Sequence, residues 1–366
     1  MGFLFCDYPL RLDVADYELS VARYAQAAAA ISLDISVFWF GKVKSPGLSD
    51  IDLLCVVPDD LPAAACRHLL ALTTRDPLFV HGPVILPRSM LNLLPWVSPG
   101  GELRHVGGPA LNLGPAELPS DYSRYLHLAN LVEGGLGRWM RLAQMRAESL
   151  LPVRGSCLRL WGLNHALDSM RAAGLAVPPA AAELVDSMLR MREEWAHQRE
   201  IAPALLPELL ERGLPMFDAL ILAGACEYRR LGGGAAPLSK SGLLVNRSVI
   251  WPGSETSAIG YGRRTYGFAG KSRSYELLSL PRPVFAYYAA RRDWFPGDAP
   301  IDVVLRQRSQ AIGRHVAFLQ SKGLPYERLD GQGRRAGHWL GLWIDRLTRR
   351  YLFWQAHRLL PGPASA

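Results

Sequence analysis

The chain lacks the features that mark several common protein classes. Its five cysteines are an odd number and form no C-x-x-C pair, which argues against a disulfide framework or a zinc knuckle. No uninterrupted apolar run approaches the roughly 18 residues that span a bilayer, and the first residues, MGFLFCDYPLRLD, do not read as a signal peptide. The G-x-S-x-G and H-E-x-x-H motifs of hydrolases are also missing. We therefore expect a cytoplasmic protein without a transmembrane segment.

Lysine is scarce, so arginine supplies 36 of the 41 basic side chains. A guanidinium group suits bidentate contacts to oxyanions. The charge is also uneven: residues 231–366 carry 20 basic and 8 acidic side chains, whereas residues 1–120 carry 8 and 12. This asymmetry predicts that a nucleic acid or another polyanion, where one binds, binds to the last third of the chain. The plain alternative is a solvated basic surface without a ligand.

Length and periodicity predict an α+β protein with more than one domain, because a single core stops growing at roughly 250 to 300 residues. Apolar spacing indicates a helix over 12–31, a strand over 34–40, a strand over 52–57, a helix over 59–73 and a strand over 78–86. Helical periodicity then dominates until about residue 230, and the region beyond it mixes strand and helix patterns, with helices expected over 301–322 and 336–359. The predicted domains are 1–115 (small mixed sheet), 116–230 (helical) and 231–366 (basic, mixed).

The most informative stretch is GKVKSPGLSDID, which opens the apolar run DLLCVV. Side chains alternate along a strand, so Asp50 and Asp52 are expected to share one face while Ile51 points into the core. Two adjacent carboxylates repel each other and raise each other's pKa, and a divalent cation relieves that repulsion. The residues before them offer backbone N–H groups, a hydroxyl and positive charge to phosphate oxygens. The candidate nucleotide-binding residues are Gly41, Lys42, Lys44 and Ser49.

With Phe40-Gly41-Lys42, the loop to Ser49 and Asp50-Ile51-Asp52-Leu53, the sequence resembles the nucleotidyltransferase superfamily typified by DNA polymerase beta and the aminoglycoside nucleotidyltransferases. The resemblance covers about residues 12 to 90. It implies a nucleotidyltransferase-like N-terminal domain in which Asp50 and Asp52 are catalytic ligands of Mg²⁺ or Mn²⁺. The implied reaction moves an NMP group from an NTP to an acceptor that the sequence does not identify.

The chain departs from that family pattern at two positions. Lys42 stands where the family has Ser after the Gly. The strand expected to supply a third carboxylate, LFVHGPVIL, contains none and offers His81 as a further candidate ligand. The nearest acidic substitutes are Asp76 and Glu102.

Two other functions compete with the transferase. The missing third carboxylate fits a catalytically silent protein that binds a nucleotide, a nucleic acid or a protein partner. The D-x-D pattern also occurs in glycosyltransferases that bind a sugar nucleotide through a metal, but these need a larger Rossmann-like domain. In the plainest interpretation, Asp50 and Asp52 are two polar residues that follow a Pro-Gly turn.

A second basic segment, GRRTYGFAGKSRS, covers residues 262–274. Its Gly270-Lys271-Ser272 resembles the end of a P-loop, but Thr265 stands where the first glycine of that motif belongs. One interpretation is a flexible basic loop that contacts phosphates, and the other is a segment that Tyr261, Tyr266 and Phe268 pack against its own domain. The candidate anion contacts are Arg263, Arg264, Lys271 and Arg273.

Overall fold

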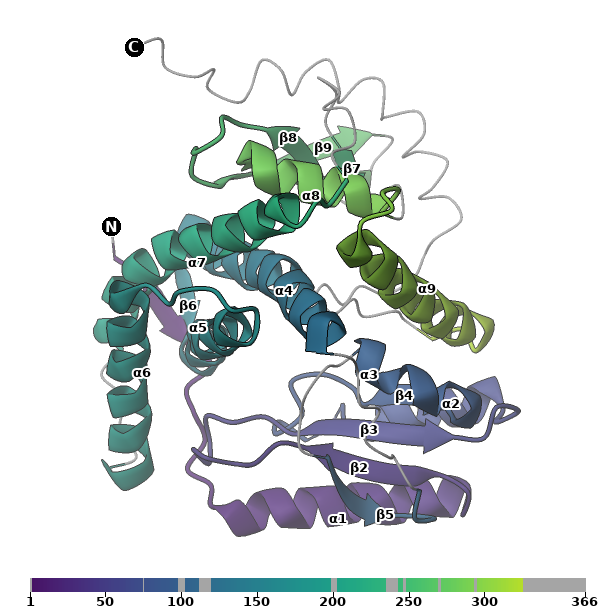
Figure 1. The fold of residues 1–366 in the computed structure, drawn as a ribbon. Coiled ribbons are helices and arrows are strands. Elements are labelled where there is room, and N and C mark those ends of the chain that lie inside the picture. Colours follow the sequence, from purple (N-terminus) through teal and green to yellow (C-terminus); the bar gives the residue numbers. More distant parts are fainter. Residues whose placement is uncertain are drawn as a thin grey trace.

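The computed structural model describes residues 2–74, 76–97, 103–111, 120–198, 203–234, 243–245, 248–268, 271–292 and 295–324. Within these residues the chain combines helices with small mixed sheets, as the α+β prediction requires. Three layers follow one another in Figure 1: a sheet backed by helix α1, a middle layer of helices, and a second sheet with helix α8.

The first layer, here called the lower unit, is built from the N-terminal third of the chain. Its four strands lie in the order β4-β3-β2-β5, with β3 parallel to β4 and β2 antiparallel to both of its neighbours. The predicted helix over 12–31 and the strands over 34–40 and 52–57 are confirmed to within two residues. The elements are α1 (Val14–Ile31), β2 (Ser36–Phe40), β3 (Asp52–Val57), α2 (Ala63–Ala71), β4 (Val84–Pro87), the 3-10 helix η1 (Arg88–Leu93), α3 (Leu94–Val97) and β5 (Leu103–Gly107).

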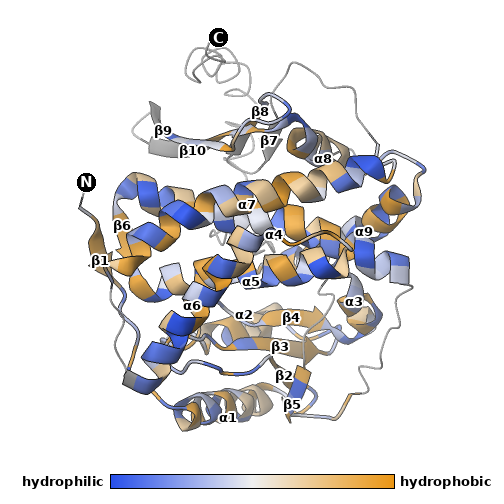
Figure 2. Ribbon diagram, turned by 60° about the vertical axis from the view of Figure 1, so that its left-hand side comes forward, coloured by the Kyte–Doolittle hydropathy of each residue, from blue (hydrophilic) through white to orange (hydrophobic). Residues whose placement is uncertain are grey.

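Strand alternation divides the lower sheet into two apolar faces. Leu53 and Cys55 pack on the face covered by α1 and α2, whereas Leu54 and Val56 pack on the opposite face, beside η1 and α3. Figure 2 shows hydrophobic residues along β2, β3 and β4, as expected for strands buried on both sides. This alternation fixes the direction of every side chain near the start of β3.

Strand β4 is shorter than the strand predicted over 78–86. It begins at Val84, and the preceding segment from Leu78 is a turn region. The Asp76 carboxylate accepts a hydrogen bond from the Leu78 N–H at 2.9 Å, which closes a local turn. Pro83 has no N–H to give to a ladder, so pairing starts only after it. His81 therefore lies on a loop and not within a strand.

The middle layer consists of four long helices, and the helical periodicity predicted for this region is confirmed. They are α4 (Ser120–Glu148), α5 (Val153–Ala172), α6 (Pro179–Gln198) and α7 (Leu205–Arg230). Two short strands, β1 (Leu4–Cys6) and β6 (Leu150–Pro152), pair in parallel and join the N-terminal segment to this layer.

In its described residues, the last third contains a second four-stranded sheet, in the order β7-β8-β10-β9, and two helices. The basic segment, for which one interpretation is a flexible loop, is instead part of an antiparallel hairpin, in which Arg263 pairs with Glu276. Its β-branched and aromatic residues favour strands, which outweighed its glycines. The elements are β7 (Leu243–Val245), β8 (Ser248–Pro252), β9 (Gly260–Phe268), β10 (Lys271–Leu280), α8 (Arg282–Arg292) and α9 (Pro300–Ser321). A helix predicted over 336–359 lies outside the described residues.

Helix α9 returns from the last third to the lower unit (Figure 1). His315 on α9 bonds through Nε2 to the carbonyl oxygen of Ile85 on β4 at 2.7 Å. Just after α9, the Lys322 ammonium donates to the carbonyl oxygen of Leu61 at 2.7 Å. The lower unit is thus held by an element from the opposite end of the described chain.

Candidate metal centre

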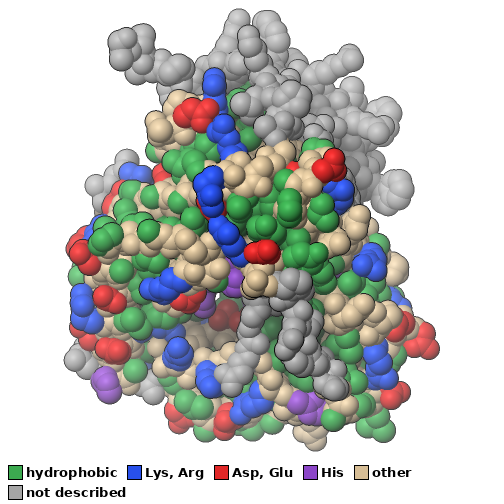
Figure 3. All heavy atoms as spheres, in the orientation of Figure 1, with side chains coloured by type: hydrophobic (Ala, Val, Ile, Leu, Met, Phe, Trp, Pro, Cys, Tyr) green, Lys and Arg blue, Asp and Glu red, His purple; other side chains and the backbone are tan. Residues whose placement is uncertain are grey.

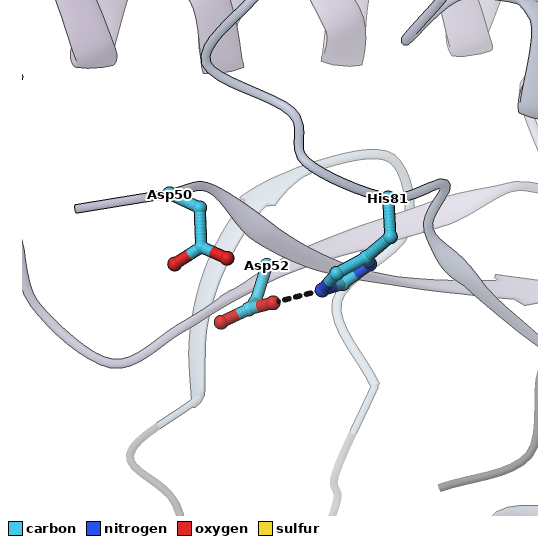
Figure 4. A group of neighbouring side chains, drawn as sticks. All are labelled: Asp50, Asp52 and His81. Carbon is cyan, nitrogen blue, oxygen red and sulfur yellow. Dashed lines mark ion pairs between the residues drawn. The ribbon is translucent and has the colours of Figure 1, made fainter. Parts of the chain in front are cut away.

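Asp50 and Asp52 lie at the start of β3 on the same face of the lower sheet. Asp52 is the first residue of the strand and pairs with Phe40 of β2. The face is the one opposite α1, because Ile51 and Leu53 are buried in the core beneath that helix. Both carboxylates are half-buried, and in Figure 4 both project to the same side of the strand. The structure thus brings the two aspartates together as the sequence predicted.

His81 approaches this pair from the loop that precedes β4. Its Nε2 lies 2.6 Å from Asp52 Oδ1, and its Nδ1 lies 2.8 Å from the carbonyl oxygen of Gly82. Both ring nitrogens face acceptors, so both carry a proton and the imidazole is positively charged. The hydrogen bond to Asp52 is the main cause that raises the pKa of His81 to about 9. In the absence of a metal, His81 acts as a cation beside the aspartates.

The surroundings of Asp50 disfavour the charged form of its carboxyl group. Burial raises the pKa of its carboxyl, and the neighbouring Asp52 charge raises it further, while His81 and Arg154 act in the opposite direction. A carboxylate under such conditions gains from a nearby cation. The Asp50 carboxylate is therefore better stabilised by a divalent ion than by the single charge of His81.

The three side chains form a group with metal-ligand geometry. One ligand atom from each of Asp50, Asp52 and His81 lies within 4.8 Å of the others. Among the residues that the structure describes, no third carboxylate joins this group. Asp76 is engaged with the backbone of Leu78, and Glu102 lies outside the described residues. The donor set is two carboxylates and one imidazole, which fits a divalent cation.

The predicted nucleotide-binding residues lie in the loop between β2 and β3. Gly41 follows β2 with a φ of +70° and open space where a side chain would be. Lys42 and Lys44 are exposed. Ser49 is buried, and its hydroxyl lies 3.4 Å from the Ser45 N–H. Nucleotide binding by these four residues stays a prediction.

The structure adds residues that hold the loop and that sequence patterns did not reveal. The Tyr17 hydroxyl on α1 donates to the carbonyl oxygen of Ser49 at 2.7 Å and accepts the Gly47 N–H at 2.9 Å. On α5, the buried Arg154 donates to the carbonyl oxygens of Ser49 at 2.8 Å and of Pro77 at 2.5 Å. Pro77 lies in the segment that leads to His81. Arg154 therefore joins the two chain segments that carry the candidate ligands.

Side chains of helix α6 also hold the loop between β2 and β3. The buried Arg192 donates from Nε to the Ser45 hydroxyl at 3.2 Å and stacks on Trp161, with 4.6 Å between the guanidinium carbon and the ring centroid. The Trp195 indole donates to the carbonyl oxygen of Pro46 at 2.6 Å. The two hydrogen bonds join residues 147 and 149 positions apart in the chain, so no local motif could have indicated them.

Of the four candidate anion contacts in the last third, only Arg263 has a described side chain. Arg263 pairs with Glu148 of α4 at 2.5 Å. The side chains of Arg264, Lys271 and Arg273 lie outside the described residues. Polyanion binding by the last third therefore stays a prediction.

Comparison of the chain with protein-family models, with curated proteins and with solved structures finds no match. In the described part of the chain, every helix is too short or too polar to span a membrane.

Proposed function

We propose that the chain is a metal-dependent nucleotidyltransferase that moves an NMP group from an NTP to an acceptor. The observation that carries this proposal is the convergence of Asp50, Asp52 and His81 at the start of β3, with their ligand atoms within 4.8 Å of one another. The order of helix and strands around the two aspartates supports it, because α1, β2, β3, α2 and β4 follow one another as the resemblance implies.

Several groups of the site support such a transfer. Asp50 and Asp52 would hold Mg²⁺ or Mn²⁺, and the bound ion would neutralise phosphate oxygens and assist the attacking acceptor oxygen. The bond from His81 Nδ1 to Gly82 orients the ring so that Nε2 points at the aspartates. Lys42 and Lys44 place positive charge on the loop beside them. The protein thereby supplies position and electrostatic stabilisation, on which phosphoryl transfer mainly depends.

The imidazole bears on which metal binds best. Mg²⁺ prefers oxygen ligands, whereas imidazole nitrogen suits the transition metals better. A site of two carboxylates and His81 should therefore favour Mn²⁺ over Mg²⁺ more than a site of three carboxylates does.

A catalytically silent protein is the second candidate, and one observation favours it. The side chain beside Asp52 is His81 and not a third carboxylate, with 2.6 Å between Nε2 and Oδ1, so its positive charge offsets the negative charge of Asp52. Such a protein would bind a nucleotide or a partner without turnover. The glycosyltransferase alternative gains no support, because in the described residues the sheet around Asp50 and Asp52 has four strands and one parallel pair.

The test measures pyrophosphate release, and the transfer of label from an NTP radiolabelled in its α-phosphate, with Mg²⁺ or Mn²⁺ and a panel of hydroxyl acceptors. Asp50→Asn and Asp52→Asn should each lower the rate by on the order of a hundredfold or more. Asp34→Asn, which changes an exposed aspartate before β2, should keep the wild-type rate.

The transferase proposal fails when the wild-type protein labels no acceptor, or when both aspartate variants remain as active as wild type. Binding of Mn²⁺ and NTP by wild type without any transfer, abolished in Asp50→Asn, is the result expected for the silent protein.

A further inference from the structure

Arg138 on α4 packs against Gly162 of α5, and Arg159 lies one turn before Gly162 on the same helix. Both arginines are half-buried. Neither makes a hydrogen bond or an ion pair among the described residues, although half-buried arginines elsewhere do: Arg124, for example, contacts Glu227 at 2.6 Å. Two guanidinium groups that repel each other and have lost part of their hydration are unfavourable without an anion.

The position of Arg138 is fixed by the packing of the two helices. A Cβ added to Gly162 of α5 would lie 2.1 Å from Arg138 Cδ and 2.4 Å from Nε. One added to Gly134, a turn earlier on α4, would lie 3.2 Å from Nη1. The side chain therefore occupies a channel that two glycines leave open, and its guanidinium loses little conformational entropy when it binds.

The charges around the pair connect it to the metal centre. Burial and, to a lesser degree, the charge of Arg159 lower the pKa of Arg138 to about 10. Burial and Arg141 lower the pKa of Arg159, whereas Asp50 raises it. Arg159 thus lies within electrostatic reach of Asp50 at the start of β3.

The space-filling view shows where a ligand could enter. In Figure 3 the surface is hollowed between the lower unit and the helical layer, with acidic and histidine side chains inside the hollow and basic side chains near its rim. A substrate that places one end on the aspartates can place an anionic group on the helical layer.

We propose that Arg138 and Arg159 form an oxyanion subsite that binds a phosphate-type group of the substrate. The identity of that substrate rests on the proposed function, but binding of the oxyanion itself requires no metal. Two guanidinium groups offer forked N–H donors that match phosphate oxygens. The group has two candidate sources, which are the terminal phosphates of the NTP and an anionic group on the acceptor.

The first experiment is calorimetric titration of the full-length protein with pyrophosphate and with tripolyphosphate in the presence of a metal chelator. Arg138→Gln and Arg159→Gln should each weaken binding by at least about tenfold, because each removes a charge-assisted contact. Arg159→Lys should bind between wild type and Arg159→Gln. Arg171→Gln, an exposed α5 arginine paired with Asp168, is the matched control and should bind as wild type does.

Failure of this subsite is distinguishable from failure of the transferase proposal. Asp50→Asn should still bind pyrophosphate without metal, whatever it does to nucleotide transfer. Displacement of pyrophosphate by NTP would assign the subsite to the nucleotide, and simultaneous binding of both would assign it to the acceptor. The subsite is overturned when the wild type binds neither anion, or when folded Arg138→Gln and Arg159→Gln both bind with wild-type affinity.

Discussion

Arg154 Nη2 donates to the carbonyl oxygen of Ser49 at 2.8 Å, across 105 positions of the chain. Ser49 immediately precedes Asp50, and the same guanidinium reaches Pro77 at 2.5 Å, four residues before His81. One buried side chain of the helical layer thus sets the relative position of the two segments that carry the candidate ligands. The geometry of the candidate metal centre therefore depends on the helical layer as well as on the lower unit.

Arg154→Met should destabilise the protein. It leaves the carbonyl oxygens of Ser49 and Pro77 without this donor, and we expect the free energy of unfolding to fall by about 2 to 4 kcal/mol. Urea unfolding followed by circular dichroism measures the change. Arg171→Met, which removes an exposed ion pair on the same helix, should change stability by no more than about 0.5 kcal/mol. Equal stability of the two variants would contradict the role assigned to Arg154, which is to hold the segments of Ser49 and Pro77 together.

Gly47→Ala should be far more costly than Gly41→Ala. Both glycines have positive φ, +86° and +70°, so both variants carry backbone strain of about 1 to 2 kcal/mol. Only at Gly47 would the new Cβ also collide with the chain, 2.0 Å from the carbonyl oxygen of Leu10. Thermal unfolding should therefore show Gly47→Ala destabilised by at least about 2 kcal/mol more than Gly41→Ala. A smaller difference would mean that the segment around Leu10 moves aside freely.

The contact between His81 and Asp52 predicts a pH-dependent stability in metal-free protein. The folded pKa of His81, about 9, is raised from its ordinary 6.5. Its stabilising contribution is therefore full below pH 6.5 and is lost as the pH rises through 9. The side chain is 36% exposed, so solvent screening reduces this contribution to about 1 kcal/mol. Urea unfolding with chelator should measure the difference in unfolding free energy between wild type and His81→Gln at pH 6 and at pH 9.5. This difference should be about 1 kcal/mol larger at pH 6. An equal difference at both pH values would contradict the raised pKa of His81.

The sequence predicted those features that follow from local periodicity. Strand alternation placed Asp50 and Asp52 on one face, and helical spacing located α1 to within two residues. Gly82-Pro83 broke the apolar run LFVHGPVIL, so His81 reached Asp52 from a loop and not from the expected strand. The contacts of Arg154 could not be predicted from the sequence, because its partners Ser49 and Pro77 lie 105 and 77 positions away. A tertiary contact of this kind leaves no local pattern.

The identity of the third ligand should decide the preference between metals. His81→Glu gives the centre three carboxylates, so Mg²⁺ affinity should rise relative to Mn²⁺ affinity by on the order of tenfold, because Mg²⁺ favours oxygen ligands over imidazole nitrogen. The variant also removes the positive charge that pairs with Asp52, so metal-free protein should lose stability through repulsion among the carboxylates. Calorimetric titration with each ion measures the ratio of affinities. His68→Glu, which adds the same charge at an exposed position of α2, should leave the ratio unchanged. An unaltered ratio in His81→Glu would show that His81 stands outside the coordination sphere and that Asp50 and Asp52 bind the ion without it.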